Sequence, residues 1–263
     1  MIDYKFFTDF QKELYTEHGY MLDKLNPSNE SWHFNKLTDK KEFINTNAHN
    51  YYLEYAHRFE KKRNTALKVL EIGVHHGYSL LLWESYFSQA HIYGIDIDLS
   101  ASFRGDTPKD LLKDKERIHL FEFDAYEKQN VENFIKEEGG NFDIIIEDGS
   151  HHPIHQLQAL SYFLPHINKE GMFIVEDVIA DIDTLLRFKR IFNLSSEAFY
   201  LDEYLTTPNK FSFDIDLEIL KKFQTEDINP TEYTLMCKDT NLEGKDCLLK
   251  MKDVFKLMIL TKL

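Results

Sequence analysis

The stretch Val69–Ser79 constrains the fold of this chain more than any other. Leu67–Ile72 is a short, mainly apolar run, typical of a buried parallel strand. Gly73 and Gly77 then bracket a tight loop, and Ser79–Phe87 has the apolar spacing of a helix. Glycine lets the backbone approach a ligand, and a helix start offers free N–H groups. The stretch therefore predicts a crevice for a nucleotide-type ligand.

The spacing of the two glycines narrows the class of ligand. It differs from the three-glycine dinucleotide fingerprint, and the lysine and hydroxyl of a phosphate-binding P-loop are absent. A second expected strand, Ala90–Asp98, follows and ends in acids. Asp96 at its tip is placed to accept hydrogen bonds from ribose hydroxyls. Together with Glu71 at the end of the first strand, this pattern indicates a crevice for S-adenosylmethionine, which carries no phosphate.

Composition and charge exclude several classes of function. The chain has 263 residues, 43% of them hydrophobic, and a net charge of -14. This length fits one large domain with an appendage, and the negative charge disfavours nucleic acid and anionic membranes as partners. The sequence shows neither a membrane-length apolar run nor a secretory signal pattern, so we expect a soluble, cytoplasmic protein. Cys237 and Cys247 fit no metal-binding spacing and are expected to be reduced thiols.

Alternating strand and helix patterns predict an α/β fold with a Rossmann-like, doubly wound sheet. The sheet is expected to be seven-stranded and mostly parallel, with an antiparallel closing strand. Residues 1–60 are expected to form an N-terminal helical lid and residues 61–263 the main domain. The further strands are expected at Ile118–Asp124, Phe142–Asp148, Gly171–Asp177, Tyr233–Lys238 and Phe255–Thr261. The further helices are expected at Phe43–Phe59, Val131–Glu138, Pro153–Leu164 and Leu217–Gln224, with Ser102–Glu116 a charged loop or helix.

Five successive strand ends carry acidic residues, and the later ones are expected to crowd together. Asp148, Glu176 and Asp177 follow two strands whose carboxyl ends should meet at one edge of the sheet. Three carboxylates repel one another unless a cation lies among them. Their hard oxygen atoms suit magnesium, manganese or calcium. The alternative is that some of these acids cap helices or pair with lysine.

The loop that begins at Asp148 adds a candidate general base. His151 lies in the turn before an expected helix, and a histidine there can take a proton near neutral pH. His151 and His155 also have the i, i+4 spacing of a zinc pair, provided that the helix begins before Pro153. A solvated loop histidine is the simplest alternative for His151.

Residues 37–178 resemble the class I S-adenosylmethionine-dependent methyltransferases, and among them the metal-dependent sugar O-methyltransferases of macrolide pathways, of the mycinamicin and macrocin type. The resemblance lies in the order of several short motifs: Thr38–Lys40, His49-x-Tyr51-x-x-x-Tyr55, Val69–Leu80, Trp83–Phe87, Gly94–Asp96, Asp148–His151 and Val175–Asp177. The chain departs from the family after the third strand, where Phe123–Ala125 replaces a Gly-Asp-Gln motif, and in the segment after Val178.

The resemblance implies roles for individual residues. Asp148, Glu176 and Asp177 would hold magnesium or manganese, and His151 would be the catalytic base assisted by Asp148. The methyl donor would be surrounded by residues of the glycine loop and of the strand ends, namely Glu71, Gly73, Gly77, Ser79, Asp96 and Asp124. A lid would bring further residues to the donor, namely Lys40, His49 and Tyr51.

We therefore expect a metal-dependent O-methyltransferase that acts on a sugar hydroxyl, carried by a nucleotide-linked or surface-polysaccharide sugar. A methyltransferase of a catechol or small phenol is an alternative with similar acids. A non-catalytic S-adenosylmethionine-binding module that partners another protein is a third, although such a module has no need of His151. The sequence leaves open whether the chain forms a homo-oligomer.

Overall fold

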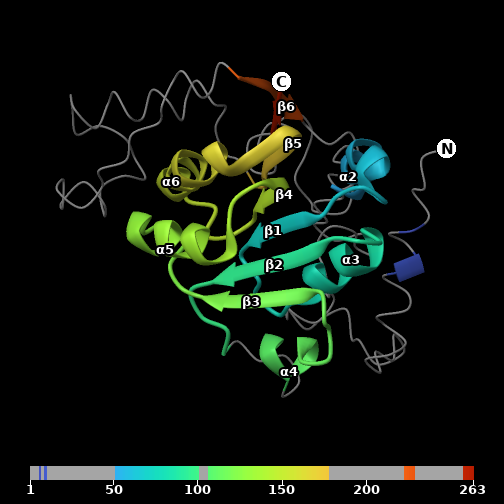
Figure 1. Ribbon diagram of the computed structural model, residues 1–263, viewed down its shortest axis with the longest axis vertical. Helices are drawn as coiled ribbons and strands as arrows, with labels where there is room; N and C mark the ends of the chain where they lie inside the picture. The colour runs from blue at the N-terminus through green and yellow to red at the C-terminus, as the bar shows by residue number, and fades with distance from the viewer. Residues whose placement is uncertain (1–5, 7–8, 11–50, 101–105, 178–221, 229–256) are drawn as a thin grey trace, which may run out of the picture.

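The computed structural model describes residues 6, 9–10, 51–100, 106–177, 222–228 and 257–263. Their strands form one sheet in the order β3-β2-β1-β4-β5-β7-β6 (Figure 1). Neighbouring strands from β3 to β5 are parallel, and β7 is antiparallel to both β5 and β6. The strands are β1 (Lys68–Ile72), β2 (His91–Asp96), β3 (Ile118–Glu122), β4 (Phe142–Glu147), β5 (Ile167–Val175), β6 (Phe223–Ile228) and β7 (Leu257–Lys262).

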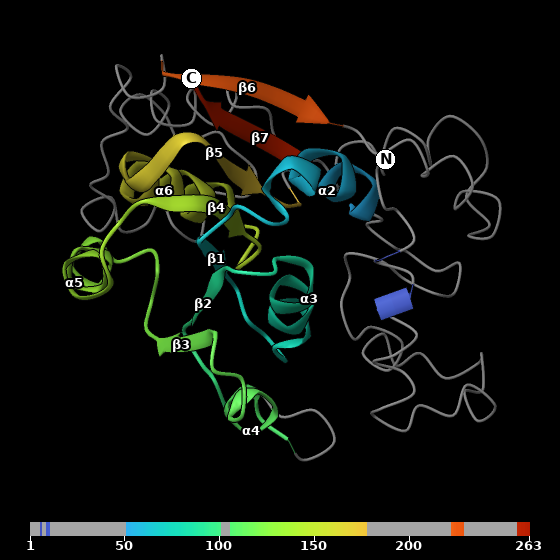
Figure 2. The same cartoon turned by 45° about the vertical axis from the view of Figure 1, so that its right-hand side comes forward.

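Helices cover both faces of the sheet, as a doubly wound fold requires (Figure 2). One hydrophobic core lies under α2 and α3 and the other under α5 and α6. The central strands β1 and β4 contribute buried side chains to both cores, which is why they read as nearly continuous apolar runs. The helices are α2 (Tyr52–Phe59), α3 (Tyr78–Tyr86), α4 (Pro108–Leu112), α5 (Lys128–Glu138) and α6 (Pro153–Phe163), with short 3-10 turns η2 (Glu60–Lys62) and η3 (Leu164–His166).

The structure confirms the expected α/β architecture, its mostly parallel sheet and its antiparallel β7, with element ends shifted by a few residues. The prediction of helix over Leu217–Gln224 is wrong where it can be compared, because Phe223 and Gln224 begin β6. Their partners on β7 satisfy the backbone in an extended conformation that the local sequence pattern did not indicate. The expected strand at Tyr233–Lys238 and residues 43–50 of the expected helix Phe43–Phe59 lie outside the described residues.

The expected N-terminal lid also lies largely outside the described residues, and the boundary at residue 60 stays a prediction. Its described residues include α2, which packs directly on the sheet domain. Tyr55 and Phe59 are fully buried and contact the ring of Trp83 on α3 edge-on. Within the ranges that the structure covers, none of the helices combines the length and apolarity needed to span a membrane.

The glycine loop after β1 passes against the loop after β4. Gly73 has a φ of 94°, and a Cβ atom there would lie 2.1 Å from the carbonyl oxygen of Asp148. The Asp148 amide in turn donates to the Ile72 carbonyl at 2.8 Å. Gly77 has a φ of 87° and is the N-cap of α3. Gly73 thus allows the end of β1 and the acidic end of β4 to touch.

We expect Gly73→Ala to lower the free energy of unfolding by about 2 to 4 kcal/mol, because the new Cβ atom would collide with backbone in a left-handed conformation. Gly77→Ala is the matched control. It shares the positive φ, but its nearest neighbour is the end of the flexible Leu112 side chain at 3.0 Å, so the loss should be about 1 kcal/mol. Urea denaturation of both variants checks the difference, and equal losses would contradict the account of this contact.

Candidate active site

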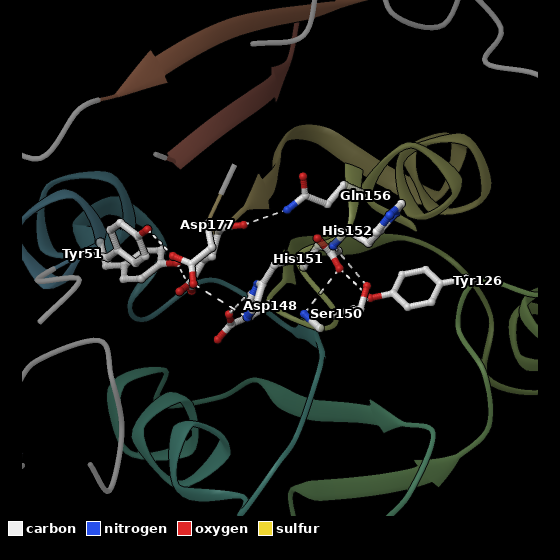
Figure 3. A network of polar contacts seen from close by, with 12 residues as sticks. Tyr51, Tyr126, Asp148, Ser150, His151, His152, Gln156 and Asp177 are labelled. Carbon is white, nitrogen blue, oxygen red and sulfur yellow. Dashed lines mark hydrogen bonds and ion pairs between the residues drawn. The ribbon is translucent and has the colours of Figure 1, made fainter. Parts of the chain in front are cut away.

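Three ionisable side chains gather at the carboxyl edge of the sheet (Figure 3). Asp148, His151 and Asp177 each offer a ligand atom, and these atoms lie within 4.8 Å of one another. His151 lies between the carboxylates, with its Nδ1 3.9 Å from Oδ1 of Asp148 and its Nε2 3.7 Å from Oδ2 of Asp177. This is the one group of three or more such residues in the described part of the chain that could hold a metal ion.

The topology explains why residues so far apart in sequence meet. β4 and β5 are parallel neighbours whose final residues, Glu147 and Val175, are paired in register. Asp148 and Asp177 follow these two ends, so both reach the same edge of the sheet. His151 has a φ of 56° and Asp177 a φ of 52°. Residues other than glycine rarely adopt this left-handed backbone conformation. Backbone strain of this kind is concentrated at functional sites.

Two tyrosines of the α2 region hold the acidic pair that follows β5. The Tyr51 hydroxyl donates to Oδ1 of Asp177 at 2.6 Å, and the Tyr55 hydroxyl donates to Oε1 of Glu176. Both tyrosines are fully buried. The sequence pattern did not indicate the contact of Tyr55 with Glu176, because the two residues are 121 positions apart. Tyr51 is expected at the methyl donor, whereas the structure shows it at Asp177.

Glu176, the third acid of the predicted metal set, stays a prediction as a metal ligand. Its side chain is fully buried and points to Tyr55, while Asp177 turns toward His151. Both acids follow the end of β5, and Asp177 has a left-handed φ of 52°. The structure brings Asp148 and Asp177 together with His151, and it does not add Glu176 to them.

The expected donor-binding residues line the neighbouring strand ends. Oδ2 of Asp96 accepts from the backbone amides of Val74 and His75 at 2.8 and 2.9 Å, which fixes the glycine loop. Oδ1 of Asp124 accepts from the Tyr126 amide at 2.9 Å. The acid at the second strand end therefore shapes the loop that the sequence predicted as a ligand site.

The other expected donor contacts are described only in part, and they stay predictions. Glu71 is fully buried and accepts from the indole of Trp83 at 3.0 Å, so the structure places it in the core under α3. Ser79 is partly exposed in the first turn of α3. Lys40 and His49 lie outside the described residues.

The structure also shows a buried acid that the sequence-based hypothesis did not use. Glu147 is fully buried, and its Oε1 accepts from the Tyr126 hydroxyl at 2.7 Å. Burial raises the pKa of Glu147 to about 7. The signal was an ionisable residue directly after the apolar run Ile144–Ile146 of a central strand, but it stood next to the more prominent Asp148.

The zinc alternative fails on geometry. Helix α6 begins at Pro153, after His151, so His151 and His155 do not share a helix face. Nδ1 of His155 instead lies 2.6 Å from Oγ of Ser150, and its ring stacks on Tyr126. His155 therefore belongs to the support of the loop rather than to the group around Asp148.

Comparisons with known proteins agree with this architecture. Residues 70–178 match a family described as a methyltransferase domain. These residues are therefore similar to a methyltransferase domain. The domain spans β1 through the acids after β5, and so includes the glycine loop and the group around His151.

Two curated relatives of the methyltransferase domain are sugar O-methyltransferases by name. The 8-demethyl-8-(2-methoxy-alpha-L-rhamnosyl)-tetracenomycin-C 3'-O-methyltransferase of Streptomyces olivaceus is 34% identical over 131 residues, 47% of this chain and 31% of the relative. The mycinamicin VI 2''-O-methyltransferase of Micromonospora griseorubida is 32% identical over 132 residues, 47% of this chain and 30% of the relative. The chain thus matches about a third of the length of these relatives.

A solved structure shows the same fold. The MycE methyltransferase of the mycinamycin pathway, solved in complex with Mg and SAH, is superimposable with a TM-score of 0.51 and 21% identity. The match covers 87% of this chain and 52% of MycE.

We expect Glu147→Gln to change how stability depends on pH. Burial raises the pKa of Glu147 from 4.5 to about 7. Between these values the carboxyl is ionised only in the unfolded chain, so the wild type loses stability as the pH rises through this window. The glutamine variant lacks this loss, which amounts to at most about 3 kcal/mol.

Urea denaturation at pH 5 and pH 8 measures this effect. Relative to the wild type, Glu147→Gln should gain stability at the higher pH, whereas the exposed control Glu132→Gln should follow the wild type. An unchanged pH dependence in Glu147→Gln would refute the raised pKa.

Proposed function

We propose that this chain is an S-adenosylmethionine-dependent and divalent-metal-dependent O-methyltransferase that acts on a sugar hydroxyl. The observation that carries the proposal is the gathering of Asp148, His151 and Asp177 beside the glycine loop of a methyltransferase domain. The names of the curated relatives favour a sugar attached to a small molecule as the acceptor. The match to about a third of their length leaves the identity of that sugar to experiment.

The donor side would use the crevice between the first three strand ends. The N-cap of helix α3 is Gly77, which has no side chain to cap the first turn, so the first amides of α3 would be available to the donor. Asp96 would accept from the ribose hydroxyls with the lone pairs that its backbone donors leave over. Lys40, His49 and Ser79 would complete the donor site. S-adenosylmethionine supplies the methyl group and leaves as S-adenosylhomocysteine.

The acceptor side has the donor set that a hard cation prefers. The carboxylates of Asp148 and Asp177 would hold magnesium or manganese, since both acids offer oxygen atoms at one point of the edge. A cation there would supply Lewis acidity that lowers the pKa of an acceptor hydroxyl. Tyr51 orients Asp177 by donating to its second oxygen, Oδ1, which leaves Oδ2 toward His151.

His151 would act as the general base. Its side chain is 43% exposed, so an acceptor can reach the imidazole from solvent. The imidazole would take the proton of the sugar hydroxyl as the oxygen forms its bond to the methyl carbon. The imidazole nitrogens lie 3.9 Å from Oδ1 of Asp148 and 3.7 Å from Oδ2 of Asp177, so the base would stand directly beside the acids of the proposed metal site.

We expect His151→Ala to lower kcat for methyl transfer roughly 10²- to 10⁴-fold, because the general base is lost. The assay uses S-adenosylmethionine with a panel of small-molecule glycosides and detects S-adenosylhomocysteine. The control His57→Ala removes an exposed histidine of α2 and should keep wild-type turnover. Unchanged turnover in His151→Ala would show that another group takes the proton.

We expect exhaustive chelation to abolish turnover and added magnesium or manganese to restore it, because the acidic pair then lacks its cation. Asp148→Asn should raise the metal concentration needed for half-maximal activity, while Glu132→Gln on the exposed face of α5 should not. Full activity after chelation would contradict the metal requirement and leave the methyl-transfer proposal standing.

A further inference from the structure

We propose that Tyr126 is a positioning residue that latches the loop carrying Asp148 and His151 to the segment after β3. The latch itself is inferred from geometry alone. Its expected effect on kcat rests on the proposed methyl transfer. No feature of the sequence pattern had singled out Tyr126.

The Tyr126 hydroxyl makes two hydrogen bonds, one to the end of β4 and one to the loop (Figure 3). It donates to Oε1 of Glu147 at 2.7 Å and accepts from the backbone amide of Ser150 at 3.1 Å. Glu147 directly precedes Asp148, and Ser150 directly precedes His151. The hydroxyl therefore holds the Glu147 side chain just before Asp148 and the backbone amide just before His151.

Gly149 makes room for this contact. A Cβ atom at position 149 would lie 2.1 Å from the Tyr126 hydroxyl oxygen and 3.3 Å from Cζ. Any larger residue would have to displace the hydroxyl. A phenylalanine ring at position 126 would remove the severe contact and leave milder ones, at 3.2 Å to Oε1 of Glu147 and 3.3 Å to Cζ.

Helix α6 fixes the tyrosine ring from a second side. The His155 ring stacks on Tyr126 with centroids 4.3 Å apart and an interplanar angle of 15°. Nδ1 of His155 also lies 2.6 Å from Oγ of Ser150. The ring is thus held by the same loop that its hydroxyl holds, which leaves the latch little freedom.

Two further observations fit a hydroxyl that stays protonated and connects two loops. Burial, and next the negative charge of Glu147, raise the pKa of Tyr126, so it keeps the proton that it donates. The Tyr126 backbone amide donates to Oδ1 of Asp124, one of the expected donor contacts. Tyr126 thereby joins the expected methyl-donor loop to the acceptor loop.

Tyr126→Phe keeps the stacked ring and removes both hydrogen bonds. We expect faster amide exchange in the peptide that spans residues 147–151, measured by hydrogen–deuterium exchange mass spectrometry. We expect kcat to fall about tenfold with little change in the KM for S-adenosylmethionine, because fewer molecules hold the base in reacting geometry. Tyr162→Phe is the matched control, because Tyr162 is a partly buried tyrosine that packs on the same core from α6.

Gly149→Ala should break the same hydrogen bonds in another way, because its methyl group pushes the Tyr126 hydroxyl away. If the latch is the shared cause, the double variant Tyr126→Phe/Gly149→Ala loses no more activity than Gly149→Ala alone. Additive losses would mean that the two residues act separately, and would overturn the proposal.

The exchange and kinetic measurements separate the latch from the proposed function. Faster exchange and lower kcat in Tyr126→Phe, with both unchanged in Tyr162→Phe, establish the positioning role. Unchanged exchange in Tyr126→Phe overturns the latch, and faster exchange with unchanged kcat overturns its role in turnover. A wild type without methyl transfer to any acceptor defeats the proposed function, while the exchange comparison still decides the latch.

Discussion

Two carboxylates at one edge of a parallel sheet are the constraint on which the site depends. β4 and β5 are neighbours, so the acids that follow them, Asp148 and Asp177, must share a small volume. Like charges there raise the energy of the folded state unless donors or positive charge lie between them. The structure supplies the His151 imidazole between the carboxylates and the Tyr51 hydroxyl on Asp177. The same arrangement would favour a divalent cation.

Each of these two strand ends carries one acid for the core and one for the crevice. Glu147 and Glu176 are fully buried, whereas the next acids along the chain turn toward His151. A tyrosine hydroxyl meets each buried glutamate, Tyr126 beside the core under α5 and α6, and Tyr55 in the core under α2 and α3. These two hydrogen bonds hold the ends of β4 and β5 from both faces of the sheet. They thereby help to position Asp148 and Asp177, the acids that follow.

The sequence predicts the central fold well, because apolar runs and glycines determine strands and turns through residues close together in the chain. The alternation of apolar strands and helices gives β1 to β5, and the glycine loop and Asp148–His151 turn point to the site. The sequence names Glu176 and Asp177 together as metal ligands, because composition at a strand tip does not show which way each of two adjacent acids turns. The contacts of Tyr51 and Tyr55 could not be predicted, since they join residues 126 and 121 positions apart. The position of the Tyr126 hydroxyl depends on the missing side chain at Gly149. Phe223–Gln224 was misassigned because its strand partners lie far along the chain.

The most direct test of this account is to locate a bound cation in crystals of the full chain grown with manganese and S-adenosylhomocysteine. Anomalous scattering identifies the manganese position without reference to any assumed chemistry. The account predicts one strong peak in contact with the carboxylates of Asp148 and Asp177 and close to the His151 imidazole. A peak at another place, or none at a manganese concentration that supports turnover, would contradict it.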